Sequence, residues 1–333
     1  MTGPLAHAPF RWLLAARTTA IVGNSVAPIA LAFAVLDLTG SAADLGLVVA
    51  ARSIANVAML LFGGVLADRL PRGAVLVGAS LAAAATQGTI AALVLTGTAG
   101  IPILVALSVV NGAVSAVSLP AAAALVPDTV PASLLRPANA LLRLGLNGGS
   151  IAGASVGAVV VAAVGPGWGL AIDAAAFAVA AILFTRLRLP QRSDAADPGA
   201  TASVWTELRE GWREFASRRW IWIVVLQFAV LNAAFVGATT VLGPLVADET
   251  FGRGGWGLVV AAQTAGLALG AVIALRWHPR RALGLGVAGM ASVALPVAVL
   301  AVQPTLALLV VAFGVGGVAI ELFAIAWDQS LQT

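Results

Sequence analysis

The sequence of 333 residues contains no cysteine and no lysine. Without cysteine there can be no disulfide framework, no thiolate nucleophile and no cysteine-ligated metal site. Without lysine there is no Walker phosphate loop and no Schiff-base chemistry, and all 18 basic residues are arginine. His7 and His278 lie far apart and form neither a metal-ligand spacing nor a catalytic triad. We therefore expect no enzymatic activity, no catalytic residues, no metal site and no cofactor.

Charged residues are also scarce. They make up only 10% of the chain, whereas 60% of the residues are hydrophobic, and the mean hydropathy is +1.01. A soluble domain of this length needs a polar surface that this composition cannot supply. A protein embedded in a lipid bilayer has an apolar surface instead. The composition predicts an all-α membrane protein.

The apolar residues are grouped into about ten stretches, each long enough to cross a bilayer as a helix. Proline and glycine are frequent within them, which membrane helices tolerate. The predicted spans are 12–36, 45–67, 74–97, 101–123, 138–163, 167–185, 220–246, 255–276, 282–302 and 305–327.

The arginines are distributed very unevenly between the two sides of these spans. If the N-terminus is cytoplasmic, fourteen lie in cytoplasmic segments and Arg253 alone lies in an outer loop. Arg17, Arg52 and Arg143 fall within spans. Because cytoplasmic loops of membrane proteins carry the positive charge, this pattern predicts a multi-pass plasma-membrane protein with a cytoplasmic N-terminus. The net charge of +4 thus indicates orientation in a membrane and not a nucleic-acid partner.

A charged segment divides the chain into unequal parts. Residues 1–185 contain six predicted spans, and residues 220–333 contain four. Between them, residues 186–219 form a cytoplasmic linker in which apolar residues recur at helical spacing. We expect an amphipathic helix on the membrane surface there, the alternative being a solvated loop. A weak repeat between 62–72 and 269–280 supports two related halves, although chance matching of two glycine-rich span ends would look similar.

The segment between the second and third spans, GGVLADRLPR, contains Gly63, Gly64, Asp68, Arg69 and Arg72. The glycines permit close helix contact, and the charged side chains can form a relay at the inner surface. This segment resembles the loop signature of the major facilitator superfamily, and we expect it to act in gating. LAFAVLDLTGSA (31–42) and IDAAAFAVAAILF (172–184) resemble the branch with macrolide-efflux and enterobactin-export proteins.

This resemblance implies two six-span halves around a central cavity that opens alternately to either side. It implies proton-driven export of an amphipathic small molecule, such as a drug, a macrolide or a siderophore-like compound. The family has twelve spans, whereas this sequence stops near the end of the tenth. The last two spans are therefore expected to be missing. The alternative is a truncated, non-transporting remnant or an interaction partner in the membrane.

Two rows of small residues recur at four-residue spacing. Gly149, Gly153 and Gly157 lie on the fifth span, and Gly266 and Gly270 lie on the eighth. Such rows allow helices to approach closely. The resemblance implies that the fifth and eighth spans meet between the halves, so we expect these glycines at that interface. General close packing is the alternative.

Charge within a span is costly and frequently functional, and three of the charged residues within spans are candidates for function. A carboxyl at Asp173 or Glu321 could carry a proton. The alternatives are a helix-packing hydrogen bond for Asp173 and contact with interfacial water for Glu321. Arg52 could pair with a carboxylate or bind an anionic group of the substrate. Asn24 cannot titrate, although related sequences often have an acid there, so proton coupling must use another position.

Overall fold

The computed structural model describes residues 3–69, 71–187, 232–276, 282–302 and 304–332, with residues 209, 212, 213, 216, 217 and 226 between them. Only the backbone is described at 61–69, 119, 120, 123, 275, 276, 282, 283, 287 and 327–332. Most of the linker predicted at 186–219, including its amphipathic helix, lies outside these residues. So does much of the span predicted at 220–246.

The described chain is built almost entirely from helices, as the composition predicts. In chain order they are η1 (Pro4–Ala6), α1 (Ala8–Thr39), α2 (Ala42–Arg69), α3 (Arg72–Leu95), α4 (Ile101–Ala124), α5 (Val126–Thr129), η2 (Ala132–Leu134), α6 (Leu135–Val164), α7 (Pro166–Thr185), η3 (Gly237–Leu242), α10 (Gly243–Glu249), α11 (Arg253–Arg276), α12 (Ala282–Gly289), η4 (Met290–Val293), α13 (Ala294–Val302) and α14 (Leu306–Gln332).

Nine helical stretches in the described residues are long and apolar enough to cross a membrane. Their bounds agree with nine of the predicted spans to within seven residues, which confirms the all-α membrane fold. The stretch predicted at 282–302 differs in detail, because the 3-10 turn η4 separates α12 from α13. In the region of the seventh span, the π-helical turn η3 leads directly into α10.

Two tight turns place charged residues at the same end of the bundle. Gly40 ends α1 in the left-handed conformation, with φ of 63°, and its amide bonds the Leu36 carbonyl. Ser41 Oγ then accepts a hydrogen bond from the Asp44 amide at 3.2 Å, and α2 starts at the next residue. Between α10 and α11, Gly252 has φ of 83° and its amide bonds the Ala247 carbonyl. Both turns need a residue that adopts positive φ without strain.

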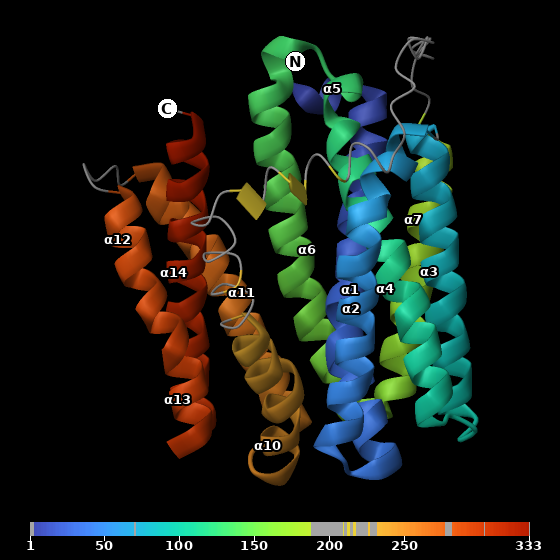
Figure 1. Cartoon of the computed structure of the whole chain (residues 1–333), viewed down its shortest axis with the longest axis vertical. Helices are drawn as coiled ribbons and strands as arrows, with labels where there is room; N and C mark the ends of the chain where they lie inside the picture. The colour runs from blue at the N-terminus through green and yellow to red at the C-terminus, as the bar shows by residue number, and fades with distance from the viewer. Residues whose placement is uncertain are drawn as a thin grey trace.

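The helices form two groups that stand side by side (Figure 1). The N-terminal group comprises α1 to α7, and the C-terminal group comprises α10 to α14. Both chain ends lie toward the upper end of Figure 1, here called the N-terminal end of the bundle. The opposite end contains the α1–α2 turn, α10 and the start of α11, and is called the Arg253 end.

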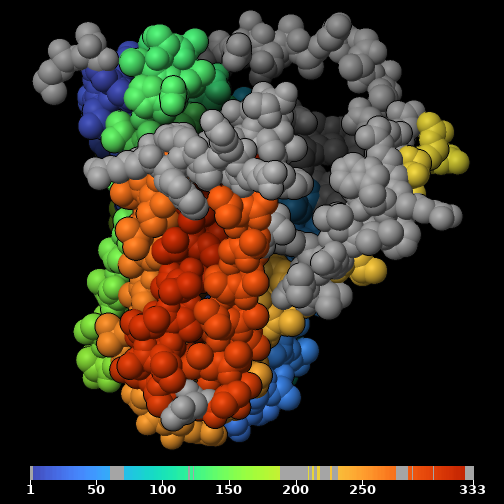
Figure 2. Space-filling view, turned by 90° about the vertical axis from the view of Figure 1, so that its left-hand side faces the viewer, coloured from blue at the N-terminus to red at the C-terminus, as the bar shows by residue number. Residues whose placement is uncertain are grey.

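The outer surface of the C-terminal group is apolar. Figure 2 views the molecule from this side, with α13 and α14 in orange to red. Val302, Leu308 and Val311 on these helices are exposed. Exposed apolar side chains of this kind suit contact with lipid, where a soluble protein would present polar groups.

Two hydrophobic cores lie at opposite ends of the bundle. The core at the N-terminal end contains Phe10, Leu13 and Phe184 and, among the described residues, draws only on the N-terminal group. The core at the Arg253 end contains Phe33 of α1 together with Trp256 of α11 and is shared by both groups. The described packing between the groups is therefore concentrated at the Arg253 end.

The predicted glycine rows do make close helix contacts, but not between the two groups. Positions for a Cβ at Gly149, Gly153 and Gly157 fall within 2.2–2.9 Å of atoms of α1. The corresponding positions at Gly266 and Gly270 fall 2.1 and 2.8 Å from carbonyl oxygens of α14. Their assignment to the interface between halves is wrong, because each row packs against a helix of its own group.

The helices α6 and α11 nevertheless meet between the groups, through other small residues. A Cβ built at Gly257 would lie 1.7 Å from the Ala158 Cβ, so only glycine fits there. One turn away, a Cβ at Gly254 would lie 3.8 Å from the Ala162 Cβ, an ordinary contact. This crossing also lies toward the Arg253 end, since Val164 ends α6 and Arg253 begins α11.

Candidate functional site

Asp173 is a fully buried carboxylate in the middle of the N-terminal group. It lies on α7 with 0% of its surface exposed, and its Oδ2 accepts a hydrogen bond from Gln87 Nε2 of α3 at 2.5 Å. Its Oδ1 has no hydrogen-bond partner among the described residues. Gly23 of α1 lies directly against it, because a Cβ at Gly23 would be 2.8 Å from Oδ1. One oxygen of Asp173 is thus free to take a proton.

Arg52 supplies the charge that balances Asp173. It lies ten positions after Ala42, which is about 15 Å along α2 and close to the middle of a membrane core. Its Nη2 donates to Asn24 Oδ1 on α1 at 3.1 Å, and its charge interacts electrostatically with Asp173. Because an uncompensated charge is costly at this depth, each of the two residues reduces the cost of burying the other.

Polar side chains on α2, α3 and α4 surround this pair. Asn56 Nδ2 donates to the Gly112 carbonyl at 3.0 Å, and a Cβ at Gly112 would lie 2.2 Å from the Arg52 carbonyl oxygen. Asn111 Nδ2 lies 3.4 Å from Thr86 Oγ1. These contacts hold α2, α3 and α4 together around the level of Arg52.

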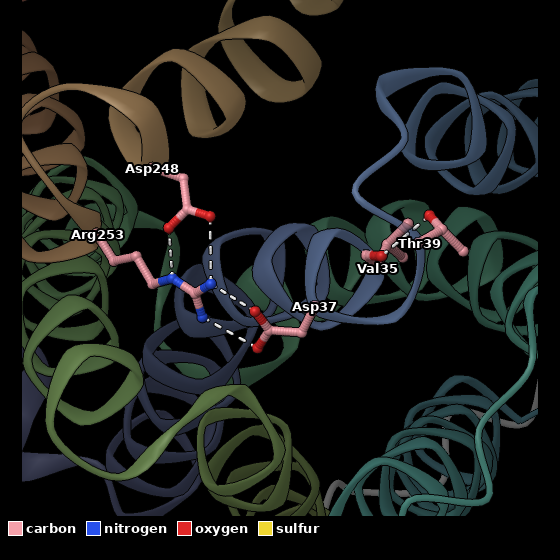
Figure 3. A network of polar contacts seen from close by, with 5 residues as sticks. All are labelled: Val35, Asp37, Thr39, Asp248 and Arg253. Carbon is pink, nitrogen blue, oxygen red and sulfur yellow. Dashed lines mark hydrogen bonds and ion pairs between the residues drawn. The ribbon is translucent and has the colours of Figure 1, made fainter.

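Arg253 forms a second site, at the end of the bundle (Figure 3). Its Nη1 donates to Asp37 Oδ2 at 3.0 Å, and its Nη2 also bonds Asp37 Oδ1. Its Nε donates to Asp248 Oδ1 at 2.7 Å, and Nη2 reaches Asp248 Oδ2 at 3.3 Å. The guanidinium carbon lies 4.8 Å from the centroid of the Phe33 ring. Since Asp37 and Phe33 belong to α1 and Asp248 to α10, one guanidinium joins the two helical groups.

The helix ends at this site account for its charge arrangement. Asp37 and Asp248 lie in the last turns of α1 and α10, where the partial negative charge of the helix C-terminus disfavours a carboxylate. Arg253 offsets this unfavourable placement, because its guanidinium donates four hydrogen bonds to the two carboxylates. Removing that guanidinium would leave two carboxylates and two helix C-termini facing one another.

The predicted gating loop is described only in part. Only the backbone is described at Gly63, Gly64, Asp68 and Arg69. Arg72, at the start of α3, donates to the Ala124 carbonyl at 3.2 Å and lies 3.7 Å from Asp128. Arg72 therefore ties α3 to the end of α4 and to α5 at the N-terminal end.

The other predicted proton carrier, Glu321, lies apart from Asp173. It is on α14, where its Cβ is 2.9 Å from the position of a Cβ at Gly270 of α11. The side chain is half-buried and makes a polar contact. The structure thus brings Arg52 and Asp173 together in one group and places Glu321 in the other.

Sequence reasoning missed the site at Arg253, although one signal pointed to it. Arg253 is the single arginine that the predicted orientation puts in an outer loop. Its partner Asp37 is 216 positions away, and nothing in the pattern of either segment predicts their pairing.

The comparisons with known proteins agree with this architecture. A family model described as the Major Facilitator Superfamily matches residues 13–330. The chain belongs to the major facilitator superfamily. Membership of this superfamily makes the protein a multi-pass membrane transporter and not an enzyme.

Solved structures of other superfamily transporters have the same fold. The crystal structure of the nucleoside transporter NupG aligns with a TM-score of 0.75 at 17% identity, covering 98% of this chain and 82% of that one. An inward-open structure of the xylose transporter XylE from E. coli gives 0.63 at 16% identity, covering 96% and 80%. An inward-facing, unoccupied bacterial homolog of the human lysosomal transporter Spinster gives 0.60 at 16% identity, covering 97% and 75%. At these identities the likeness concerns the fold alone. No curated protein matches the chain.

Proposed function

We propose that the protein is a secondary active transporter that exports an amphipathic small molecule in exchange for protons. The observation that carries this proposal is the contrast between the two ends of the bundle. At the Arg253 end, the two helical groups are joined by the Arg253–Asp37 pair and by a shared core. At the N-terminal end, the described core belongs to one group. Groups joined at one end are suited to alternating access, in which contacts at the two ends form in turn.

The arginine distribution supports placing the Arg253 end outside the cell. With a cytoplasmic N-terminus, α1 ends at the outer surface, and the turn before α11 also lies at that surface. The described arrangement then corresponds to a carrier closed to the outside and ready to receive cargo from the cytoplasm. Export would follow when the groups separate at the Arg253 end.

The proton would be carried by Asp173. Its free Oδ1 and its full burial suit a carboxyl that alternates between two protonation states. Gln87 holds the carboxyl in place through its hydrogen bond to Oδ2. Glu321 of α14 is a second candidate, from the C-terminal group.

The direction and the class of cargo rest on the resemblance of 31–42 and 172–184 to exporters of macrolides and enterobactin. The small, weakly polar side chains that dominate these helices suit a cargo with a large apolar surface. We therefore expect drug-like, macrolide-like or siderophore-like compounds.

The test uses everted membrane vesicles from cells that express the full chain. A panel of fluorescent cationic dyes, a macrolide and a catecholate siderophore is added outside, and accumulation is followed with and without an acidic lumen. Accumulation of at least one compound that requires the proton gradient is the expected result. Absence of uptake across the panel, with the protein shown to be present in the membrane, would refute export. Uptake only when the gradient is reversed would refute the direction.

A further inference from the structure

Arg253 bonds two carboxylates, one from its own helical group and one from the other group. Asp248 and Arg253 belong to the same helical group and flank a short turn. The Gly252 amide bonds the Ala247 carbonyl and closes this turn. The ring of Trp256 packs against Gly243, which further fixes α10 on α11. The Arg253–Asp248 pair is therefore built into one rigid unit.

Asp37 is different, because it comes from the other group. It lies at the end of α1, 216 positions before Arg253 in the sequence. The Phe33 ring, one turn earlier on α1, also contacts the guanidinium. Any separation of the groups at this end must break the contacts of Arg253 with Asp37 and Phe33. The same separation leaves the contacts with Asp248 intact.

We propose that Arg253 is a latch, meaning a side chain whose ion pairs hold the two helical groups together at the Arg253 end. Asp37 is the partner that it releases when the groups separate, and Asp248 is the partner that it keeps. Arg253 keeps its bonds to Asp248 when the groups separate, so opening breaks only the ion pair with Asp37. The inference rests on the proposed alternating access, and it assigns opposite effects to two carboxylates that bond the same guanidinium.

The opposite effects follow from the free energy of the open state relative to the closed one. Asp37→Asn weakens a contact that exists only in the closed state, so it favours opening. Asp248→Asn removes the partner that Arg253 keeps in the open state, so opening now leaves the guanidinium without a carboxylate. The second change therefore favours closure. A conformational equilibrium responds only to interactions that differ between its two states.

Arg253→Gln is expected to open this end most strongly. It removes the bond between the groups and leaves Asp37 and Asp248 facing each other, where like charges repel. The expected order of opening is Arg253→Gln, then Asp37→Asn, then the unchanged protein, then Asp248→Asn. For Asp37→Asn we expect the open-to-closed ratio to rise about two- to fivefold, the range of partly exposed ion pairs.

The experiment uses the absence of native cysteine. Thr98, in the turn after α3, and Thr305, before α14, are exposed at the Arg253 end of different groups. Both are changed to cysteine in the full chain and carry spin labels. The distance between the labels is measured by double electron–electron resonance in the purified protein in lipid nanodiscs. The comparison includes Arg253→Gln, Asp37→Asn and Asp248→Asn.

Two matched controls remove a carboxylate at the same end without touching the latch. Asp44→Asn lies in the first turn of α2, and Glu249→Gln is adjacent to Asp248. We expect both to leave the distances unchanged. A swapped protein carrying Asp37→Arg and Arg253→Asp restores an opposite-charge pair between the groups and is expected to return to the short distance. That recovery also shows that the single variants were folded.

Longer distances in Asp37→Asn and shorter or narrower ones in Asp248→Asn support the assignment. If both variants shift the distances in the same direction, or if Arg253→Gln leaves them unchanged, the latch is refuted. The measurement needs neither cargo nor a proton gradient. A failed export assay with the expected distance order would therefore refute the proposed cargo or coupling while leaving the latch in place.

Discussion

The guanidinium of Arg253 and the carboxylate of Asp37 are joined by two hydrogen bonds across 216 positions of sequence. This pair is a direct polar connection between the end of α1 and the start of α11 (Figure 3). A two-pronged contact of this kind fixes the orientation of its partners as well as their distance. It therefore defines how the two helical groups meet at this end.

The first prediction concerns the shape of the cation. Arg253→Lys keeps the charge, but a single ammonium cannot form parallel bonds to Asp37 while it also bonds Asp248. We expect label distances at Thr98 and Thr305 between those of the unchanged protein and those of Arg253→Gln. If Arg253→Lys matches the unchanged protein, charge alone holds the latch and the fork geometry is irrelevant.

The second prediction concerns the crossing of α6 and α11. Gly257→Ala would place its Cβ 1.7 Å from the Ala158 Cβ, so the helices must separate and the Arg253 end must open. Combining it with Ala158→Gly removes the overlap and leaves 3.0 Å to the Ala158 Cα, which should restore most of the closed state.

Gly254→Ala is the matched control for this crossing, because its Cβ would meet the Ala162 Cβ at an ordinary 3.8 Å. The same pair of spin labels reports on all three proteins. An unchanged distance in Gly257→Ala would show that this crossing does not limit closure, and an equal effect of Gly254→Ala would show a general loss of helix packing.

The predicted glycine rows show what a sequence pattern can and cannot establish. Gly149, Gly153 and Gly157 were expected to allow close approach, and they do. Their partner was wrong, because the spacing of small residues specifies a smooth helix face and not the helix that meets it. The small residues of α6 that do meet α11, Ala158 and Ala162, have the same four-residue spacing, so the spacing alone does not tell which row faces the other group.

The helices themselves were largely predictable, because a membrane span is defined by a long apolar stretch. The break at η4 was not predictable, because the composition of Met290–Val293 is equally compatible with a 3-10 turn and an α-helical turn. Asp173 was predicted as a buried charge. Its contact with Gln87 required the packing of α3 against α7, which no local pattern encodes. The residues of the latch likewise come together only in the folded bundle.

The third prediction tests the packing of α1 against α7. Gly23→Ala would bring a Cβ to 2.6 Å from the Ala176 Cβ and 2.8 Å from Asp173 Oδ1. Since the Ala176 Cβ is fixed to the backbone, the helices must move apart, at an expected cost of about 1–3 kcal/mol. Thermal unfolding in detergent measures this loss. Gly78→Ala on α3 is the control, because its Cβ would meet nothing within 4 Å, and we expect no loss of stability there.

The fourth prediction concerns coupling. Asp173→Asn keeps the size of the side chain but cannot exchange a proton, so cargo accumulation in everted vesicles should no longer depend on an acidic lumen. Cargo binding should persist, because the fully buried carboxyl does not reach the surface. Glu321→Gln is tested in parallel. If both variants retain the full dependence on the proton gradient, neither carboxyl carries the coupling proton.

The fifth prediction treats Arg52 and Asp173 as one charged unit. Arg52→Gln leaves a buried carboxylate without its balancing charge, and Asp173→Asn leaves a buried guanidinium in the same position. Each single variant should therefore be clearly less stable than the unchanged protein. The double variant buries neither charge and should recover part of this loss. A favourable coupling of about 1–3 kcal/mol is expected from the mutant cycle.

Denaturation of the four proteins in the same detergent micelles measures this coupling, with no need for cargo. The control cycle combines Arg52→Gln with Asp44→Asn, a carboxylate in the first turn of the same helix. That cycle should be additive, since Asp44 lies eight positions before Arg52, about 12 Å away along α2. Additive losses for Arg52 and Asp173 would mean that the two charges are buried independently. Arg52 would then not balance the negative charge of ionised Asp173, and the proposed coupling would lose its electrostatic basis.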